Sequence, residues 1–133
     1  MRITKLDLGG TSQFLTKDAV SLSIDGTKMC EEDDLSLVVI GDYNRPPFKS
    51  ETFKTIKGCC YIEGPVDPFE LARVAKPKAK LWVRGCGPAD LEVKCVATLL
   101  WRAGFKITKM SLPVYSEDMG WEWDEGISAV KEA

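Results

Sequence analysis

The sequence predicts an α+β protein in which a mostly antiparallel, β-rich sheet packs against two helices, at residues 67–75 and 88–103. Three observations predict this class. Short stretches alternate apolar and polar residues, as half-buried strands do. Two longer stretches carry helix start and stop signals, and several strands follow one another directly. The 133 residues, 44% of them hydrophobic, suit a single domain over 1–133 with an acidic, Trp-containing C-terminal segment at 116–133.

The first half of the chain reads as strands separated by turns. Strand patterns occupy residues 2–8, 20–24, 35–40 and 53–62. Breaks rich in turn residues follow the first two, at Gly9-Gly10-Thr11-Ser12 and Asp25-Gly26. The third is rich in Leu, Val and Ile and is expected to be the central strand. The fourth could instead be a helix that ends at Gly58.

The second half carries both helices. Asp67 can cap the first helix, Pro68 suits its first position, and Glu70 has the spacing of a capping box. The second helix is expected to run from Pro88 to Ala103, with Gly104 as its C-terminal cap. Each helix is followed by a predicted strand, at 80–84 and at 106–110.

The second helix is apolar around most of its circumference. Its polar residues Asp90, Lys94, Thr98 and Arg102 form one narrow stripe at four-residue spacing. A helix of this kind needs cover on more than one side. We therefore predict self-association, unless the first helix and the tail supply that cover. The expected interface residues are Val93, Val96, Leu100, Trp101, Trp121 and Trp123.

Charge divides the chain into three parts. Residues 45–109 hold thirteen basic and six acidic side chains, whereas 1–44 hold four and eight and 110–133 hold one and six. A basic middle can form a positive face that binds phosphate groups. The alternative is that these side chains are spread over the surface and neutralised locally. The candidate RNA- or lipid-binding residues are Arg73, Lys76, Lys78, Lys80, Arg84, Arg45, Lys49, Lys54 and Lys57.

The residue inventory argues against catalysis and against a metal site. The chain has no histidine, so the commonest general base is missing. Cys86, between Gly85 and Gly87, is the one candidate nucleophile, and a buried thiol in a tight turn is the alternative reading. The five cysteines show no C-x-x-C spacing, so no zinc site is expected. No cofactor is predicted either, and a small cysteine-dependent enzyme remains the second hypothesis.

The acidic C-terminal segment alternates large apolar and acidic residues. Met119, Trp121 and Trp123 would lie on one side of a strand that completes the chain's own sheet or docks on a neighbour. Residues Leu112–Tyr115 also match a short motif that recruits WW-domain partners. An adaptor that binds partners through this acidic tail is therefore a third hypothesis.

Two segments resemble bornavirus matrix proteins. They are Leu6-Asp7-Leu8-Gly9-Gly10-Thr11-Ser12-Gln13-Phe14-Leu15, similar to an early strand and turn of that family, and Lys80 through Met110, similar to a later strand, turn and long helix. The resemblance implies a small matrix protein of a negative-strand RNA virus. Such proteins have a compact β-rich fold, assemble as homo-oligomers, which in bornaviruses are tetramers, and lie between membrane and ribonucleoprotein.

The leading hypothesis from these observations is a viral matrix-like structural protein. It would bind anionic phospholipid, single-stranded RNA or nucleoprotein through the basic middle. Its expected location is the virion and the host cytoplasm or inner membrane face, or the cytoplasm if the chain is not viral.

Overall fold

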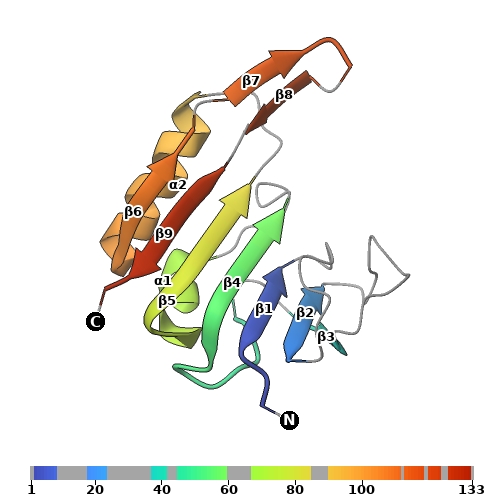
Figure 1. Cartoon of the computed structure of the whole chain (residues 1–133), viewed down its shortest axis with the longest axis vertical. Helices are drawn as coiled ribbons and strands as arrows, with labels where there is room; N and C mark the ends of the chain where they lie inside the picture. Colours follow the sequence, from blue (N-terminus) through green and yellow to red (C-terminus); the bar gives the residue numbers. More distant parts are fainter. Residues whose placement is uncertain are drawn as a thin grey trace.

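The structure is a computed structural model of the whole chain (Figure 1). It describes residues 2–8, 18–23, 37–41, 45–59, 67–84, 90–111, 113–118, 120–123 and 126–132. Its two helices are α1 (Pro68–Val74) and α2 (Asp90–Ala103). Its strands are β1 (Lys5–Leu8), β2 (Ala19–Ser23), β3 (Leu37–Ile40), β4 (Phe53–Cys59), β5 (Ala75–Arg84), β6 (Phe105–Met110), β7 (Pro113–Ser116), β8 (Gly120–Trp123) and β9 (Ile127–Lys131).

Seven strands form one mixed, mostly parallel sheet in the order β3-β2-β1-β4-β5-β9-β6. The pairs from β3 through β5 are all parallel. Only β9 runs the other way, because it pairs antiparallel with both β5 and β6. The prediction of a mostly antiparallel, matrix-like sheet is therefore wrong.

The lengths of the connections explain this error. Residues 9–18, 24–36 and 41–52 separate the first four strands, so each connection is at least ten residues long. Hairpins use about two to five residues, whereas parallel neighbours need a crossover of roughly a dozen. The alternation of apolar residues reports that a strand is half buried, but it carries no information on the direction of its neighbour.

Two strands differ from expectation in place or type. β3, predicted to be central, lies at an edge of the sheet, and its Ile40 is 66% exposed. β4 is a strand throughout and not a helix ending at Gly58. Strand position follows from the direction in which each crossover turns, so a short apolar run does not reveal whether it becomes central or peripheral.

The first predicted helix is confirmed together with its cap. The Asp67 carboxylate accepts a hydrogen bond of 2.8 Å from the backbone N–H of Phe69, and Pro68 opens the helix. Glu70, expected to close a capping box, pairs instead with Arg73 one turn later. A nearby guanidinium binds a carboxylate more strongly than a neutral backbone amide does.

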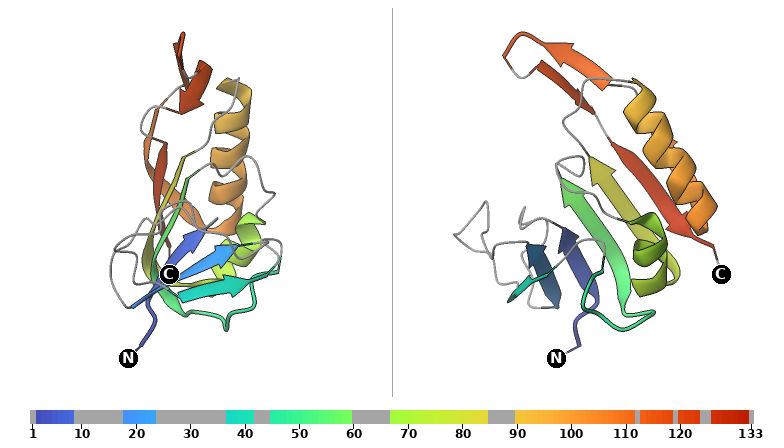
Figure 2. Two further views of the ribbon diagram at one scale, coloured as in Figure 1. Left: turned by 90° about the vertical axis from the view of Figure 1, so that its right-hand side faces the viewer. Right: turned by 180° about the vertical axis from the view of Figure 1, so that it is seen from behind.

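Both helices lie on the same face of the sheet, as the two views in Figure 2 show. The core between them and the strands includes Leu6, Ile56, Leu81, Val83 and Phe105, each no more than 2% exposed. Because strand residues alternate between faces, Asp7, Lys57 and Trp82 point to the face turned away from α1 and α2. We call this the opposite face. None of the helices in the described part of the chain is long and apolar enough to span a bilayer.

The C-terminal segment divides between two sheets. β8 pairs antiparallel with β7 in a separate two-stranded ribbon beyond the end of the main sheet (Figure 1). β9 then inserts between β5 and β6. The expectation that Trp121 and Trp123 lie in a strand is confirmed, but that strand does not join the main sheet. In the predicted WW motif, Pro113–Tyr115 lie in the paired strand β7, and Leu112 lies outside the described residues.

Gly126 allows β9 to enter the sheet. Its φ is 75°, in the left-handed region that favours glycine. A Cβ built there would lie 2.3 Å from the backbone oxygen of Val83 on β5. The buried backbone of residue 126 therefore lies directly against β5, where no side chain fits.

We expect Gly126→Ala to destabilise the protein by about 3–5 kcal/mol, because it adds a backbone clash to backbone strain. Gly104→Ala is the matched control, since Gly104 also has a positive φ, of 109°, but a Cβ there would meet nothing within 4 Å. That variant should lose only about 1–2 kcal/mol. Urea unfolding measures both, and equal losses would contradict the role given to close packing on β5.

Candidate functional site

The order of the strands creates a switch point between β1 and β4. From β1 the chain moves outward to β2 and β3, whereas from β4 it moves the other way to β5. The connections that leave the carboxyl ends of β1 and β4 therefore diverge. In open α/β sheets, ligands bind in the crevice outside the carboxyl ends of the strands at such a point. This edge is the candidate site.

The described floor of the site is built from the ends of adjacent strands. Leu8 of β1 is the register partner of both Leu22 of β2 and Gly58 of β4. Gly58 is buried, and a Cβ added there would lie 3.2 Å from the Cβ of Leu8. Glycine thus lets the two strands that flank the switch point pack closely.

A buried carboxylate lies one residue inside this edge. Asp7 is only 1% exposed, and its Oδ2 accepts a hydrogen bond of 2.8 Å from the Oγ of Ser21 on β2. Its register partner on the other side is Lys57 of β4. Burying a charge without polar partners is costly. The polar neighbours Ser21 and Lys57 therefore distinguish the surroundings of Asp7 from those of an ordinary apolar core.

The sequence places turn residues just beyond these strand ends. Gly9-Gly10 follow β1, and Asp25 follows β2 by one residue, although both lie outside the described residues. From the sequence alone these residues indicate only breaks between strands. The signal that could have linked them is the length of the connections, because parallel strands bring the residues after their carboxyl ends to a single edge.

The predicted basic residues do not converge into one patch. Lys57, Lys80 and Arg84 lie on the opposite face. Lys80 and Arg84 are at alternate positions of β5 on either side of Trp82, and Lys57 of β4 is the register partner of Trp82. Arg45 and Lys49 are exposed in the loop before β4. Lys54 is exposed on β4, and Lys76 is half-buried in β5. Lys78 is exposed with a φ of 66°, beside the irregularity in β4–β5 pairing.

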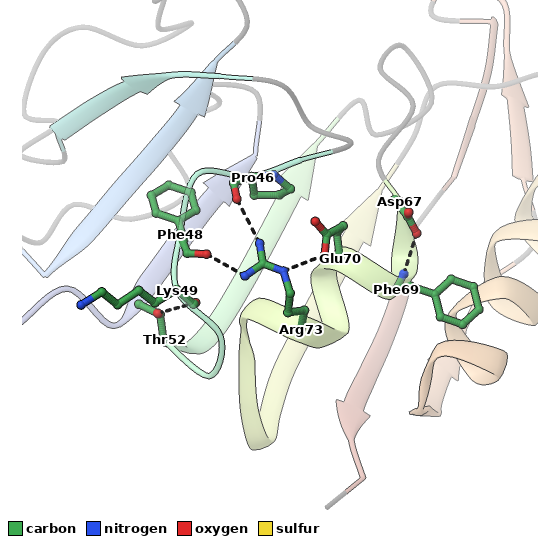
Figure 3. A network of polar contacts seen from close by, with 8 residues as sticks. All are labelled: Pro46, Phe48, Lys49, Thr52, Asp67, Phe69, Glu70 and Arg73. Atoms are coloured by element: carbon green, nitrogen blue, oxygen red, sulfur yellow. Dashed lines mark hydrogen bonds and ion pairs between the residues drawn. The ribbon is translucent and has the colours of Figure 1, made fainter.

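Arg73 contacts three other residues of the protein (Figure 3). Its Nε lies 2.6 Å from Oε2 of Glu70, while Nη1 and Nη2 donate to the backbone oxygens of Phe48 and Pro46 at 2.7 and 3.1 Å. The ring of Phe48 packs edge-on against Phe53, with centroids 5.0 Å apart. Arg73 thus fastens the loop before β4 to α1.

The predicted interface residues are similarly divided. Leu100 is fully buried in the chain's own core, and Val96 packs partly buried against it. Trp101 is 66% exposed. The side chains of Val93, Trp121 and Trp123 lie outside what the structure describes, as does Cys86. The chain's own sheet therefore covers part of the α2 surface that was assigned to another subunit.

No protein-family model matches the chain, and no curated protein matches its sequence significantly. Solved structures do match its fold. A SAM-dependent methyltransferase from Aquifex aeolicus is 18% identical with a TM-score of 0.63, covering 97% of this chain and 82% of that chain. A Haloferax volcanii protein solved in complex with the methyltransferase activator Trm112 is 13% identical with a TM-score of 0.70, covering 98% and 83%. The [4+2]-cyclase SpnF is 12% identical with a TM-score of 0.69, covering 99% and 75%.

These similarities overturn the resemblance to bornavirus matrix proteins. The match extends over nearly the whole chain and concerns the Rossmann-like fold of SAM-dependent methyltransferases. The predicted functions as a virion structural protein and as a non-enzyme are therefore wrong. The expected partners, namely an assembled homo-oligomer, anionic phospholipid, RNA or nucleoprotein, are overturned with them. The two similar segments were a strand with its turn and a strand–helix–strand unit, which many α/β folds contain.

We expect Arg73→Lys to destabilise the protein by about 2 kcal/mol, because a lysine cannot replace the two hydrogen bonds to backbone carbonyls. Glu70→Gln is the matched control. It removes the half-buried ion pair but leaves the hydrogen bonds to the backbone carbonyls, so its cost should be at most about 1 kcal/mol. Thermal unfolding checks both variants, and a larger loss in Glu70→Gln would contradict the assignment.

Proposed function

We propose that this chain binds S-adenosylmethionine at the switch point between β1 and β4 and acts as a methyltransferase. The observation that carries the proposal is the sheet order, with parallel β3-β2-β1-β4-β5 followed by antiparallel β9 between β5 and β6. Solved structures that match this fold include SAM-dependent methyltransferases from Aquifex aeolicus and Methanosarcina mazei. Fold alone does not decide function, so the site residues must also suit the ligand.

The described residues fit a nucleoside cofactor with a cationic tail. Close packing of Leu8 against Gly58 leaves the edge between β1 and β4 narrow, and Gly9-Gly10 follow it without side chains to obstruct a ligand. The carboxylate of Asp7, which Lys57 balances in part, adds negative charge one residue inside this edge, and such charge suits a sulfonium and an ammonium group. Asp25, just beyond β2, has the position from which an acidic side chain binds ribose hydroxyls in dinucleotide-binding folds.

The absence of histidine is compatible with this chemistry. When bound, S-adenosylmethionine supplies a methyl group whose carbon–sulfur bond breaks toward sulfur as an acceptor lone pair attacks. The cofactor carries the electrophile and its leaving group, so the protein's tasks are binding, orientation and exclusion of water. A catalytic set of side chains, such as one built on histidine, is therefore not required for this reaction.

Isothermal titration with S-adenosylhomocysteine, the demethylated product, tests the cofactor part of the proposal. We expect saturable binding, weakened about tenfold by Asp25→Asn through loss of a charge-assisted hydrogen bond. Asp18→Asn is the matched control, because Asp18 lies at the amino end of the same strand, where it pairs with Lys5 at 3.3 Å. Absence of binding, or equal weakening by both variants, would contradict the proposal.

A further inference from the structure

A cavity of about 460 Å³ lies on the opposite face of the sheet. Its floor is formed by β4, β5, β9 and β6, away from both described helices. Its volume is in the range of small-molecule sites, about 300–1,000 Å³. The lining residues are Thr55, Lys57, Lys80, Leu81, Trp82, Thr108, Ser128, Ala129 and Val130.

Strand register arranges the lining in two rows. In one row Lys80 lies between its partners Thr55 of β4 and Val130 of β9. In the next row Trp82 lies between Lys57 of β4 and Ser128 of β9. Neighbouring strands are about 4.8 Å apart and alternate residues about 6.6 Å apart along a strand. Trp82, which is half-buried, and Lys80 are therefore neighbours on this face, at alternate positions of β5.

The charge of this cavity is positive. Both ionisable residues in the lining are lysines. By register, Lys57 lies beside the buried Asp7 of β1, so Lys57 is partly balanced within the sheet. Lys80 is exposed and forms no ion pair with another described residue. Lys80 is accordingly the main cationic anchor.

We propose that this cavity is a second binding site, for a small aromatic carboxylate. The ring of such a ligand stacks on Trp82, and its carboxylate binds the ammonium group of Lys80. The hydroxyl of Ser128 lies beside Trp82 by register and adds a polar contact at the far side of the ring. The site is separate from the carboxyl edge of β1 and β4, and it does not depend on the proposed methyl transfer.

NMR titration of the ¹⁵N-labelled full chain with indole-3-acetate tests the site. We expect saturable shifts of the Trp82 indole N–H and of the backbone at Thr55, Lys80 and Ser128, with a Kd below about 1 mM. The neutral analogue indole-3-acetamide should bind about tenfold more weakly, because it lacks the charge-assisted hydrogen bond. Equal binding of the acid and the amide would overturn the proposal.

Two variants separate the cavity from general surface charge. Lys80→Gln should weaken indole-3-acetate about tenfold. Lys106→Gln should leave it unchanged, because Lys106 shares this face as the partner of Val130 but does not line the cavity. Equal effects of the two variants, or equally strong shifts with inorganic phosphate alone, would show that only nonspecific surface charge binds the ligand. Either result would overturn the proposal. If S-adenosylhomocysteine displaced indole-3-acetate, the cavity would be part of the cofactor site, and the proposal of a separate site would be overturned.

Discussion

The insertion of β9 between β5 and β6 organises the second half of the molecule. β9 pairs antiparallel on both sides, with Ile127 opposite Val83 of β5 and Met110 of β6. Without it, β5 and β6 would lack the partner that joins them, and α2 would connect two separate pieces of sheet. The insertion requires the backbone of Gly126 to lie directly against β5. A single residue without a side chain thus permits both the continuous core under α2 and the cavity on the opposite face.

The two faces of the sheet serve different purposes because adjacent strand residues point in opposite directions. On β5, Leu81 and Val83 lie in the core beneath the helices, whereas Lys80 and Trp82 line the cavity. On β1, Leu6 and Leu8 enter the same core while Asp7 pairs with Ser21 on the other side. The apolar residues determine that the sheet forms, and the residues between them are available for recognition.

The candidate cofactor site depends on topology more than on any one side chain. Five parallel strands bring their carboxyl ends to one edge, at Leu8, Ser23, Ile40, Cys59 and Arg84, although these residues are far apart in sequence. A fold of this kind supports more than one chemistry, as the cyclase SpnF illustrates. In such proteins the bound cofactor supplies the reactive group and the protein supplies its orientation. This division of labour is compatible with a chain that has no histidine.

Local chemistry in the sequence determined the elements that depend on neighbouring residues. The Asp67–Pro68 start of α1 and the left-handed Gly104 after α2 were both readable, because caps and turns involve groups a few residues apart. Strand direction, the edge position of β3 and the engagement of Arg73 were decided only by the tertiary structure. Each depends on groups brought together by crossovers, and apolar periodicity reports burial without reporting the neighbour that causes it. The switch point lies in this second class, since Asp7, Ser21 and Gly58 become one site only when three strands lie side by side.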